Sequence, residues 1–207
     1  MLKKEKDATL CASYRGITVT PIIGKTFEYS MLRKLKLTSM TDLQFGFTEG
    51  LNPIMASLLI SEAKCEKKKK SAFDVVQHKI LLDKLIGQSI HPTLWLIIKY
   101  LYSDLTKWAG ELSESFDIFQ GVRQEGILST HLYKIFVQDL LLELESQCLG
   151  FQLGDIYIGT LTCADDIALI ESSKDNLQIM INVIGRYAKQ HHYRIHPMKT
   201  YTILYNK

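Results

Sequence analysis

Two adjacent aspartates, Asp165 and Asp166, stand between two apolar stretches of the sequence. Carboxylate oxygens are ligands that Mg²⁺ prefers, and two such ions about 4 Å apart can clamp the attacking and leaving oxygens of a phosphoryl transfer. An aspartate pair at a turn is more often simply polar and solvated. The pair therefore leaves two interpretations open: a hydrophilic turn, or a metal site for phosphoryl chemistry.

The flanking residues predict that this pair lies at the tip of a β-hairpin. The stretch DIYIGTLTCA precedes the pair and IALIES follows it. Apolar residues in both stretches would bury the stems of the hairpin and fix its tip, namely Leu161, Ile167, Leu169 and Ile170. A hairpin tip lifts its side chains out of the sheet, so both carboxylates could reach one spot.

Helices are predicted to pack behind this hairpin. Helical spacing and entry signals place them at 26–37, 52–63, 78–86, 91–105 and 130–145, the last with Ser129 as its N-cap. A further helix has one apolar face made of Leu177, Met180, Ile181, Ile184, Tyr187 and Ala188. Extended chain is predicted at 14–25, a hairpin at 107–119 and a strand at 200–205. The irregular alternation indicates an α+β fold, with helices on one face of a sheet.

Composition excludes membrane-spanning and secreted classes. The net charge of +3 neither indicates nor excludes a nucleic-acid-binding protein. No apolar run reaches the roughly 18 residues that a membrane-spanning helix needs. The N-terminal MLKKEKDATL lacks the apolar region of a signal peptide. We therefore predict an intracellular protein, in the nucleus or the cytoplasm, without a membrane partner.

Cysteines and histidines give little support for a zinc site. No C-x-x-C pair occurs, so we interpret the four cysteines as reduced thiols: Cys11, Cys65, Cys148 and Cys163. A histidine cluster leaves two interpretations, a metal site or a solvated loop: His191, His192 and His196. No cysteine or carboxylate lies near the cluster in sequence, which favours the loop.

Four further segments precede the hairpin in a fixed order. YRGITVTPIIGKTFE begins at Tyr14 and QFGFTEGLNP at Gln44, while SAFDVVQHKILLDKL begins at Ser71 and QGVRQEGILS at Gln120. In this order, and with the A-D-D hairpin, the chain closely resembles the reverse transcriptase domain of non-LTR (LINE-like) retrotransposons. The resemblance runs from about residue 7 to residue 204.

The resemblance implies the fingers and palm of a polymerase right hand. One domain would cover residues 1–207, with about 1–65 fingers-like and 71–207 palm-like. The palm would be an RRM-like antiparallel sheet backed by helices, with the A-D-D hairpin at 155–172. No segment resembles a thumb, which we expect to be absent.

The resemblance also implies catalytic roles. Asp165 would be a direct Mg²⁺ ligand and Asp166 its supporting neighbour, while Cys163 stands where the family usually has an aromatic residue. The segment HPMKT resembles a late motif whose lysine donates a proton to the pyrophosphate leaving group, which makes Lys199 the candidate. A plain surface lysine is the other interpretation of Lys199.

Nucleotide-binding roles follow in the same way. Gln120 and Gly121 would lie near the sugar of the incoming nucleotide, where a glycine permits close approach to the backbone. Glu125 replaces a glycine of the family. Either its negative charge lies beside the nucleic-acid backbone and is unfavourable there, or its side chain points to solvent. Phe73 matches the aromatic residue that lies under the sugar and rejects ribonucleotides, or it is a core phenylalanine.

Two basic residues lie in the segment that resembles the fingers. Arg15 and Lys25 would meet phosphates there, and a generic solvated charge is the alternative for each.

One catalytic residue of the family pattern is missing. The pattern D-x-x-K-A-F-D puts an aspartate five residues before the aromatic, but Lys68 stands there and Ser71 replaces the lysine of the pattern. We interpret this as the absence of about one strand between Glu66 and Ser71. The loss should expose hydrogen-bonding edges of the sheet and leave a gap in the core. A frameshift or a mis-joined exon in the gene model would produce the same amino-acid sequence.

Three functions follow. The first is an RNA-directed DNA polymerase that uses Mg²⁺, an RNA template, a DNA primer and deoxynucleotides by two-metal catalysis, inactive as written because the first catalytic aspartate is missing. The second is a non-catalytic nucleic-acid-binding remnant, against which the weak net charge argues. The third is a decayed retroelement relic, which we rank above the second.

Overall fold

The computed structural model describes residues 21–35, 41–45, 72–103, 119–123, 126–163, 166–195, 200 and 202. Several predictions fall outside these residues: the helix at 52–63, the lysine-rich segment 64–70, and the hairpin at 107–119 apart from Phe119. Of the strand predicted at 200–205, Thr200 and Thr202 are described, and neither lies in a strand.

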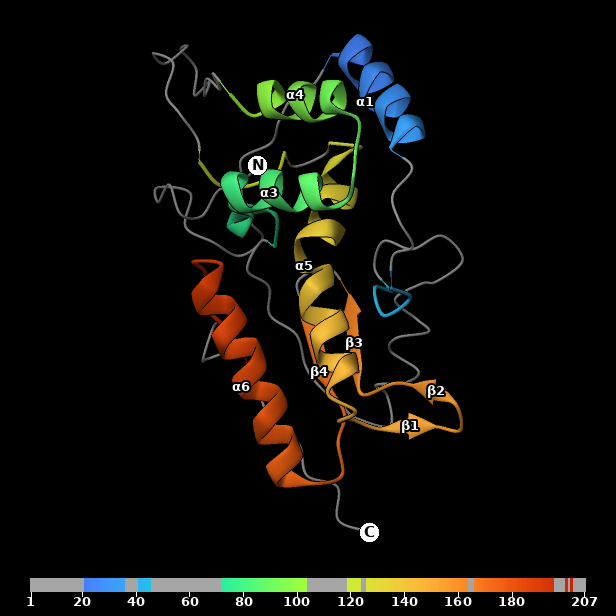
Figure 1. The fold of residues 1–207 in the computed structure, drawn as a ribbon, viewed down its shortest axis with the longest axis vertical. Coiled ribbons are helices and arrows are strands. Elements are labelled where there is room, and N and C mark those ends of the chain that lie inside the picture. Colours follow the sequence, from blue (N-terminus) through green and yellow to red (C-terminus); the bar gives the residue numbers. More distant parts are fainter. Residues whose placement is uncertain are drawn as a thin grey trace, which may run out of the picture.

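The helices are α1 (Ile22–Lys34), the 3₁₀ turn η2 (Ala72–Val75), α3 (His78–Gly87), α4 (Pro92–Leu101), α5 (Ser129–Ser146) and α6 (Lys174–Gln190). The strands are β1 (Gln152–Leu153), β2 (Ile156–Tyr157), β3 (Thr160–Cys163) and β4 (Asp166–Leu169). In Figure 1, α5 runs down the middle, with α3, α4 and α1 around its first turns and α6 along its far half. No helix of the described ranges is both long and apolar enough to cross a membrane.

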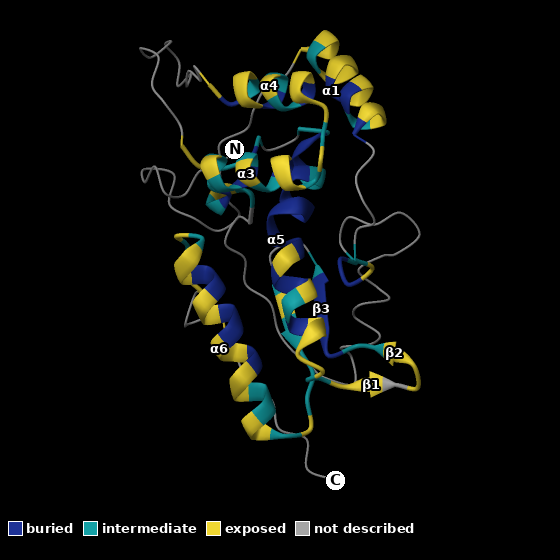
Figure 2. Cartoon of the chain, viewed as in Figure 1, coloured by how far each residue is buried: buried dark blue, intermediate teal, exposed yellow. Residues whose placement is uncertain are grey.

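Helix α5 is the centre of the core, as predicted from its apolar residues on several sides. Figure 2 shows it buried along most of its length. Its largest fully buried side chains include Leu132, Phe136, Leu140 and Leu144. Towards its N-terminus α5 packs with α3 and α4, and towards its C-terminus with the face of α6 that contains Met180. Burying such side chains contributes roughly 1.5–3 kcal/mol each.

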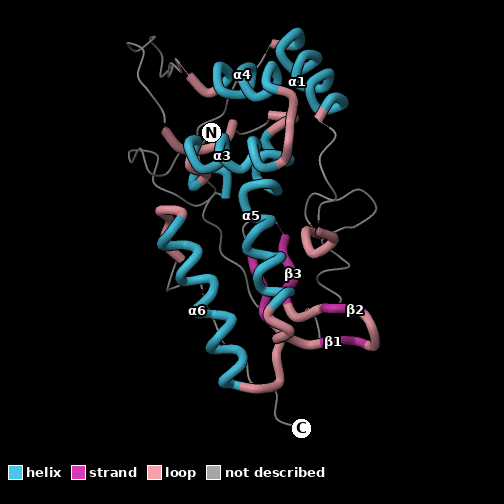
Figure 3. The backbone as a smooth tube through the Cα atoms, in the orientation of Figure 1, coloured by secondary structure: helices cyan, strands magenta, loops and turns pink. Residues whose placement is uncertain are grey.

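The strands form two short antiparallel ribbons (Figure 3). β1 pairs with β2, and β3 pairs with β4 in a register that sets Thr160 opposite Leu169 and Cys163 opposite Asp166. The predicted single stem before the aspartates is therefore split into β2 and β3. The split falls at Gly159, whose Cα lies so close to Gly150 that a Cβ on Gly159 would come within 2.6 Å of the Gly150 Cα.

Proline marks the start of two helices, and only one of these starts was predicted correctly. α4 begins at Pro92 as expected, and the His91 ring accepts a hydrogen bond from the Thr93 amide. α1 begins at Ile22, directly after Pro21, so the extended chain predicted at 14–25 is wrong for 22–25. On α6 the predicted apolar face is confirmed at four buried residues, Met180, Ile184, Tyr187 and Ala188. It is wrong at Ile181, which is 37% exposed, and it omitted the buried Val183.

Lys84 ties α3, α5 and α6 together. Its ammonium group donates to Asp139 Oδ2 at 2.6 Å, and to the Phe136 carbonyl and the Tyr187 hydroxyl at 3.0 Å each. Burial lowers the pKa of Lys84, although the bond to Asp139 opposes this. The His191 ring stacks on Tyr187 with centroids 3.7 Å apart. The prediction of a solvated loop was therefore wrong for His191, which caps the end of α6.

Acidification should weaken the fold through His191 and His131. Burial lowers the pKa of both side chains from the ordinary value of 6.5. The folded state then binds fewer protons than the unfolded chain, so the free energy of unfolding is highest above pH 6.5 and falls as pH drops below it. Urea unfolding between about pH 7.5 and about pH 5 should record this loss. His191→Phe keeps a ring on Tyr187 and should flatten the profile; identical slopes for both proteins would contradict the assignment.

Candidate active site

The segment 119–122 forms a hydrogen-bonded ladder with the turn that contains Phe73. The Val122 amide donates to the Phe73 carbonyl at 2.7 Å, and the Gly121 amide donates to the Val76 carbonyl at 2.7 Å. Gln77 Nε2 donates to Gln120 Oε1 at 2.8 Å. Three residues of the predicted nucleotide site, Phe73, Gln120 and Gly121, are thus brought together from positions nearly fifty apart in sequence.

Gly121 occupies a backbone conformation that favours glycine. Its φ is +96°, and a Cβ there would lie 3.3 Å from the Phe73 carbonyl oxygen and 3.5 Å from the Asp74 Cα. The sequence predicted a glycine here for close approach of a ligand; in the structure, the left-handed backbone and the packing of the two segments require it.

Replacing this glycine should loosen the ladder. Gly121→Ala forces a side chain into the left-handed region and against the Phe73 carbonyl, so we expect the free energy of unfolding to fall by about 1–3 kcal/mol. Urea unfolding measures the change. Gly87→Ala is the matched control, because nothing lies within 4 Å of a Cβ there. A Gly121→Ala protein as stable as the parent would contradict the strained geometry.

Phe73 lies partly in the core. Its ring makes an edge contact with Tyr133, with centroids 5.8 Å apart, and it packs against the main hydrophobic cluster. Both of its predicted roles stay open in this position, because the side chain is only half-buried. Asp74, in the same 3₁₀ turn, is exposed.

The β3–β4 hairpin carries the aspartate pair, as predicted. Asp166 is the first residue of β4, half-buried and opposite Cys163, while Asp165 lies outside the described residues. Strand β3 is buried at Thr160, Leu161 and Thr162, since it lies between β4 and another segment and packs on α5. The hairpin is therefore anchored through β3, whose strand direction is toward the beginning of α5 (Figure 1).

The second edge of β3 is occupied. The Thr162 amide donates to the Leu43 carbonyl at 3.0 Å, and the Phe45 amide donates to the Thr162 carbonyl at 2.9 Å. The Thr162 hydroxyl adds a bond to the Leu43 carbonyl at 2.8 Å. The predicted exposed edge is therefore wrong at Thr162, because Leu43–Phe45 pair there in the parallel direction.

Glu171 fixes the base of the hairpin. Its carboxylate accepts hydrogen bonds from the amides of Gly150 at 2.7 Å, Ser172 at 2.7 Å and Ser173 at 3.0 Å. Burial would raise the pKa of Glu171, but these hydrogen bonds outweigh it and lower the pKa from its ordinary value. Ser173 in turn caps the N-terminus of α6. The Glu171 carboxylate therefore joins the hairpin to Gly150, which precedes β1, and to the start of α6.

Sequence reasoning missed Glu28, which caps the N-terminus of α5. Its Oε2 accepts from the amides of Ile127 at 2.8 Å and Leu128 at 3.3 Å, and Oε1 lies 3.8 Å from Arg123 Nη1. Ser129, the predicted N-cap, is instead the first helical residue. A lone glutamate on an amphipathic helix carries no signal that distinguishes this role from a solvated one.

Arg123 belongs to the QGVR segment and extends this contact. It donates to the Leu101 carbonyl and lies over the Tyr102 ring, with 5.7 Å from its guanidinium carbon to the ring centroid. Burial raises the pKa of Tyr102, while a hydrogen bond with Ser129 and the Arg123 charge oppose the rise. The loop is thus held at Gly121 by one set of contacts and at Arg123 by another.

The other predicted site residues are not brought into this arrangement. Lys25 is exposed on α1. Outside the described residues lie Arg15, Lys68, Glu125, Asp165, His196 and Lys199. Among those described, no group of three His, Cys, Asp or Glu side chains could hold a metal ion. Asp166 is the described member of the predicted Mg²⁺ pair.

Comparison with known proteins gives matches that cover nearly the whole chain, including the A-D-D hairpin and the four segments that precede it. The family model for reverse transcriptase (RNA-dependent DNA polymerase) matches residues 2–206. A retrovirus-related Pol polyprotein from the type-1 retrotransposable element R2 of Nasonia vitripennis is 24% identical over 222 residues, covering 98% of this chain and 21% of that polyprotein. The helices and small antiparallel ribbons agree with that family. The chain therefore belongs to the reverse transcriptase family, as a reverse transcriptase domain of the non-LTR retrotransposon type.

Proposed function

We propose that this chain is a non-LTR reverse transcriptase domain that keeps its nucleotide-facing loop but does not catalyse nucleotidyl transfer as written. The observation that carries the proposal is Lys68, which stands five residues before Phe73 where the family pattern has its first catalytic aspartate.

The chemistry explains why one residue matters so much. In nucleotidyl transfer the primer 3′ oxygen loses its proton and attacks the α-phosphorus of a deoxynucleotide, and the bond to the pyrophosphate leaving group breaks. Divalent ions, when bound, stabilise the attacking and leaving oxygens. Asp165 and Asp166 come from one hairpin, so a second element must supply another carboxylate. A lysine at that place would repel the cations.

The composition of the chain supports the loss of a segment near Lys68. The residues before Ser71 read KCEKKKK, whereas a central strand is apolar.

The retained half of the site would face a deoxynucleotide, an RNA template and a DNA primer. The ladder that joins Phe73 to Gly121 supports this, since it keeps the two nucleotide-binding motifs in register. On this proposal Arg15 and Lys25 would meet phosphates, and Lys199 would lie near the pyrophosphate. Mg²⁺ would have Asp165 and Asp166 as ligands only if the missing carboxylate were restored.

Primer extension tests the proposal. The purified chain, given an RNA template, a DNA primer, deoxynucleotides and Mg²⁺, should add no nucleotide above background. Asp165→Ala should give the same background. Extension that depends on the divalent ion and is abolished by Asp165→Ala would refute the proposal.

The buried core around α5 argues against the alternative of a decayed relic that no longer folds, because more than twenty hydrophobic side chains are buried in the described residues. Cooperative urea unfolding with coincident fluorescence and circular dichroism transitions would argue against an unfolded relic. Affinity for RNA that falls with salt, without extension, would identify a nucleic-acid-binding remnant.

A further inference from the structure

His78 contacts the nucleotide-facing loop twice. Its backbone amide donates to the Phe119 carbonyl at 3.0 Å, and its ring Nε2 lies 2.6 Å from the Gly121 carbonyl oxygen. These two contacts straddle Gln120, whose side chain is exposed. His78, at the start of α3, therefore contacts the loop on both sides of Gln120, the residue predicted to lie near the sugar of the nucleotide.

The chemistry of the contact fixes the state of the ring. A carbonyl oxygen only accepts hydrogen bonds, so Nε2 must carry the hydrogen. The neutral ring is then the Nε2–H form. In this form the ring donates a hydrogen bond to the carbonyl of Gly121, the residue with the left-handed backbone.

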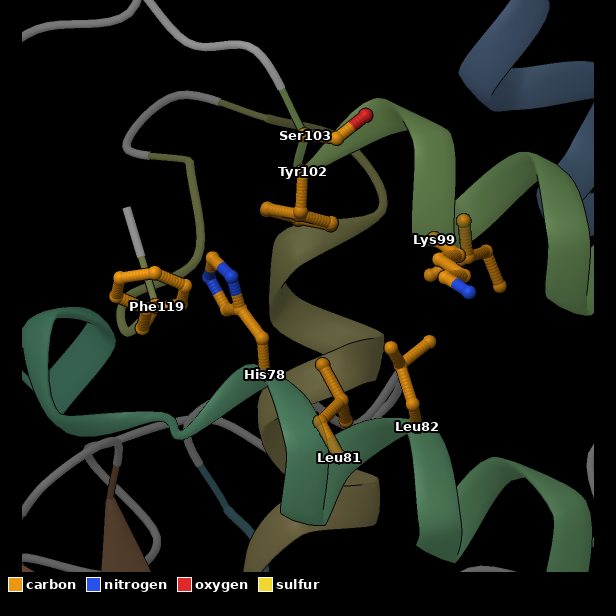
Figure 4. A pocket seen from close by; sticks show the side chains of 8 residues that line it. His78, Leu81, Leu82, Lys99, Tyr102, Ser103 and Phe119 are labelled. Carbon is orange, nitrogen blue, oxygen red and sulfur yellow. The ribbon is translucent and has the colours of Figure 1, made fainter. Parts of the chain in front are cut away.

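The ring is held in place by its surroundings. It lines a cavity of about 210 Å³ together with Leu81 and Ile98, and its centroid lies 5.0 Å from that of Tyr102. Figure 4 shows the imidazole reaching from the start of α3 toward Tyr102, with Phe119 on its other side. Because the ring packs against side chains of α3 and α4, the donor is pre-positioned by the core.

We propose that His78 is a positioning residue for the nucleotide site: its Nε2–H holds the Gly121 carbonyl and thereby fixes the loop on which Gln120 is presented. The value of this contact to nucleotide binding rests on the function proposed above, whereas the hold on the loop does not. A net hydrogen bond contributes about 1 kcal/mol, which corresponds to roughly a fivefold change in an equilibrium.

Two substitutions separate the donor from the ring. His78→Phe keeps an aromatic ring in the cavity and removes the donor. His78→Gln loses the ring but places an amide N–H at a similar reach. A purely packing role predicts that Phe is the better replacement, and a positioning role predicts that Gln is.

Amide hydrogen exchange on the full chain tests the hold on the loop. In His78→Phe, exchange at Gly121 and Val122 should speed up by roughly fivefold relative to amides in α5, whereas in His78→Gln it should stay within about twofold of the parent. Nitrogen-15 spectra of the parent at neutral pH should show His78 with hydrogen on Nε2. Unchanged exchange in His78→Phe, equal exchange in both variants, or hydrogen on Nδ1 alone would overturn the proposal.

Titration with a fluorescent deoxyadenosine triphosphate tests the link to the nucleotide site. If the parent binds this probe, His78→Phe should weaken binding by roughly fivefold and His78→Gln by less than about twofold. Equal affinity in the parent and His78→Phe would overturn the positioning role. If the parent does not bind the probe but the exchange result holds, the proposed nucleotide site fails while the hold of His78 on the loop stands.

Discussion

Glu28→Ala should lower the free energy of unfolding by about 3 kcal/mol, because it removes three interactions from a buried position at once. The side chain is 4% exposed, and its carboxylate accepts from the Ile127 and Leu128 amides at the start of α5. A negative charge there also interacts favourably with the positive end of the helix dipole. Arg123, which lies 3.8 Å away and is 19% exposed, would lose its counter-charge. Urea unfolding followed by circular dichroism measures the loss.

Two further variants sharpen this test. Glu28→Gln keeps one oxygen that can accept from the two amides, but it loses the charge and replaces the oxygen that faces Arg123 by an NH₂ group, so about 1 kcal/mol should be lost. Ser30→Ala changes an exposed residue of the same helix and should leave stability within about 0.5 kcal/mol. If Glu28→Ala costs no more than Ser30→Ala, α1 does not cap α5.

The same contact carries a functional consequence. Glu28 lies on α1, in the part of the chain that resembles the fingers, and Arg123 lies in the QGVR segment beside Gly121. Their pairing joins these two parts through the first turn of α5. A change at Glu28 on α1 should therefore reach the 119–123 segment directly, through the ion pair with Arg123.

The helices were predictable because their signals are local. Apolar residues at helical spacing and an entry proline were enough for α3 and α4, since neither signal depends on the rest of the fold. The burial of α5 followed from apolar residues on several sides. The face of α6 was placed less well, because Val183 and Ile181 are both β-branched and only their packing partners decide which is buried.

The motifs of the candidate site could be found in the sequence, but the contacts among their residues could not. Family resemblance identified Phe73, Gln120 and Gly121, and the structure brings them together. The roles of Glu28 and His78 depend on backbone groups far away in sequence, so no local pattern could indicate them. The pairing of Leu43–Phe45 with β3 was missed for the same reason, because a strand edge is recognised only when its partner is known.

Gly159→Ala should be at least as damaging as Glu28→Ala, and it acts on the hairpin that carries the aspartates. A Cβ at Gly159 would lie 2.6 Å from the Gly150 Cα and 2.7 Å from Tyr157 Cε2. Backbone cannot move aside as a flexible side chain can. Separating the two segments would strain the bond from the Ile170 amide to the Gly159 carbonyl and that from the Phe151 amide to the Ile170 carbonyl. We expect a loss of about 3 kcal/mol from overpacking and weakened hydrogen bonds.

Gly185→Ala is a control that should change the free energy of unfolding in the opposite direction. Gly185 lies inside α6 and is exposed, and a Cβ there would meet nothing within 4 Å, so alanine should raise stability by about 0.5–1 kcal/mol through helix propensity. Urea unfolding of both variants therefore distinguishes a packing clash from a general effect of replacing glycine. A Gly159→Ala protein as stable as its parent would mean that the two glycine backbones are not in contact. The hairpin would then be joined to the segment before β1 by hydrogen bonds, from Phe151 to Ile170 and from Gly150 to Glu171, rather than by the packing of the two glycines.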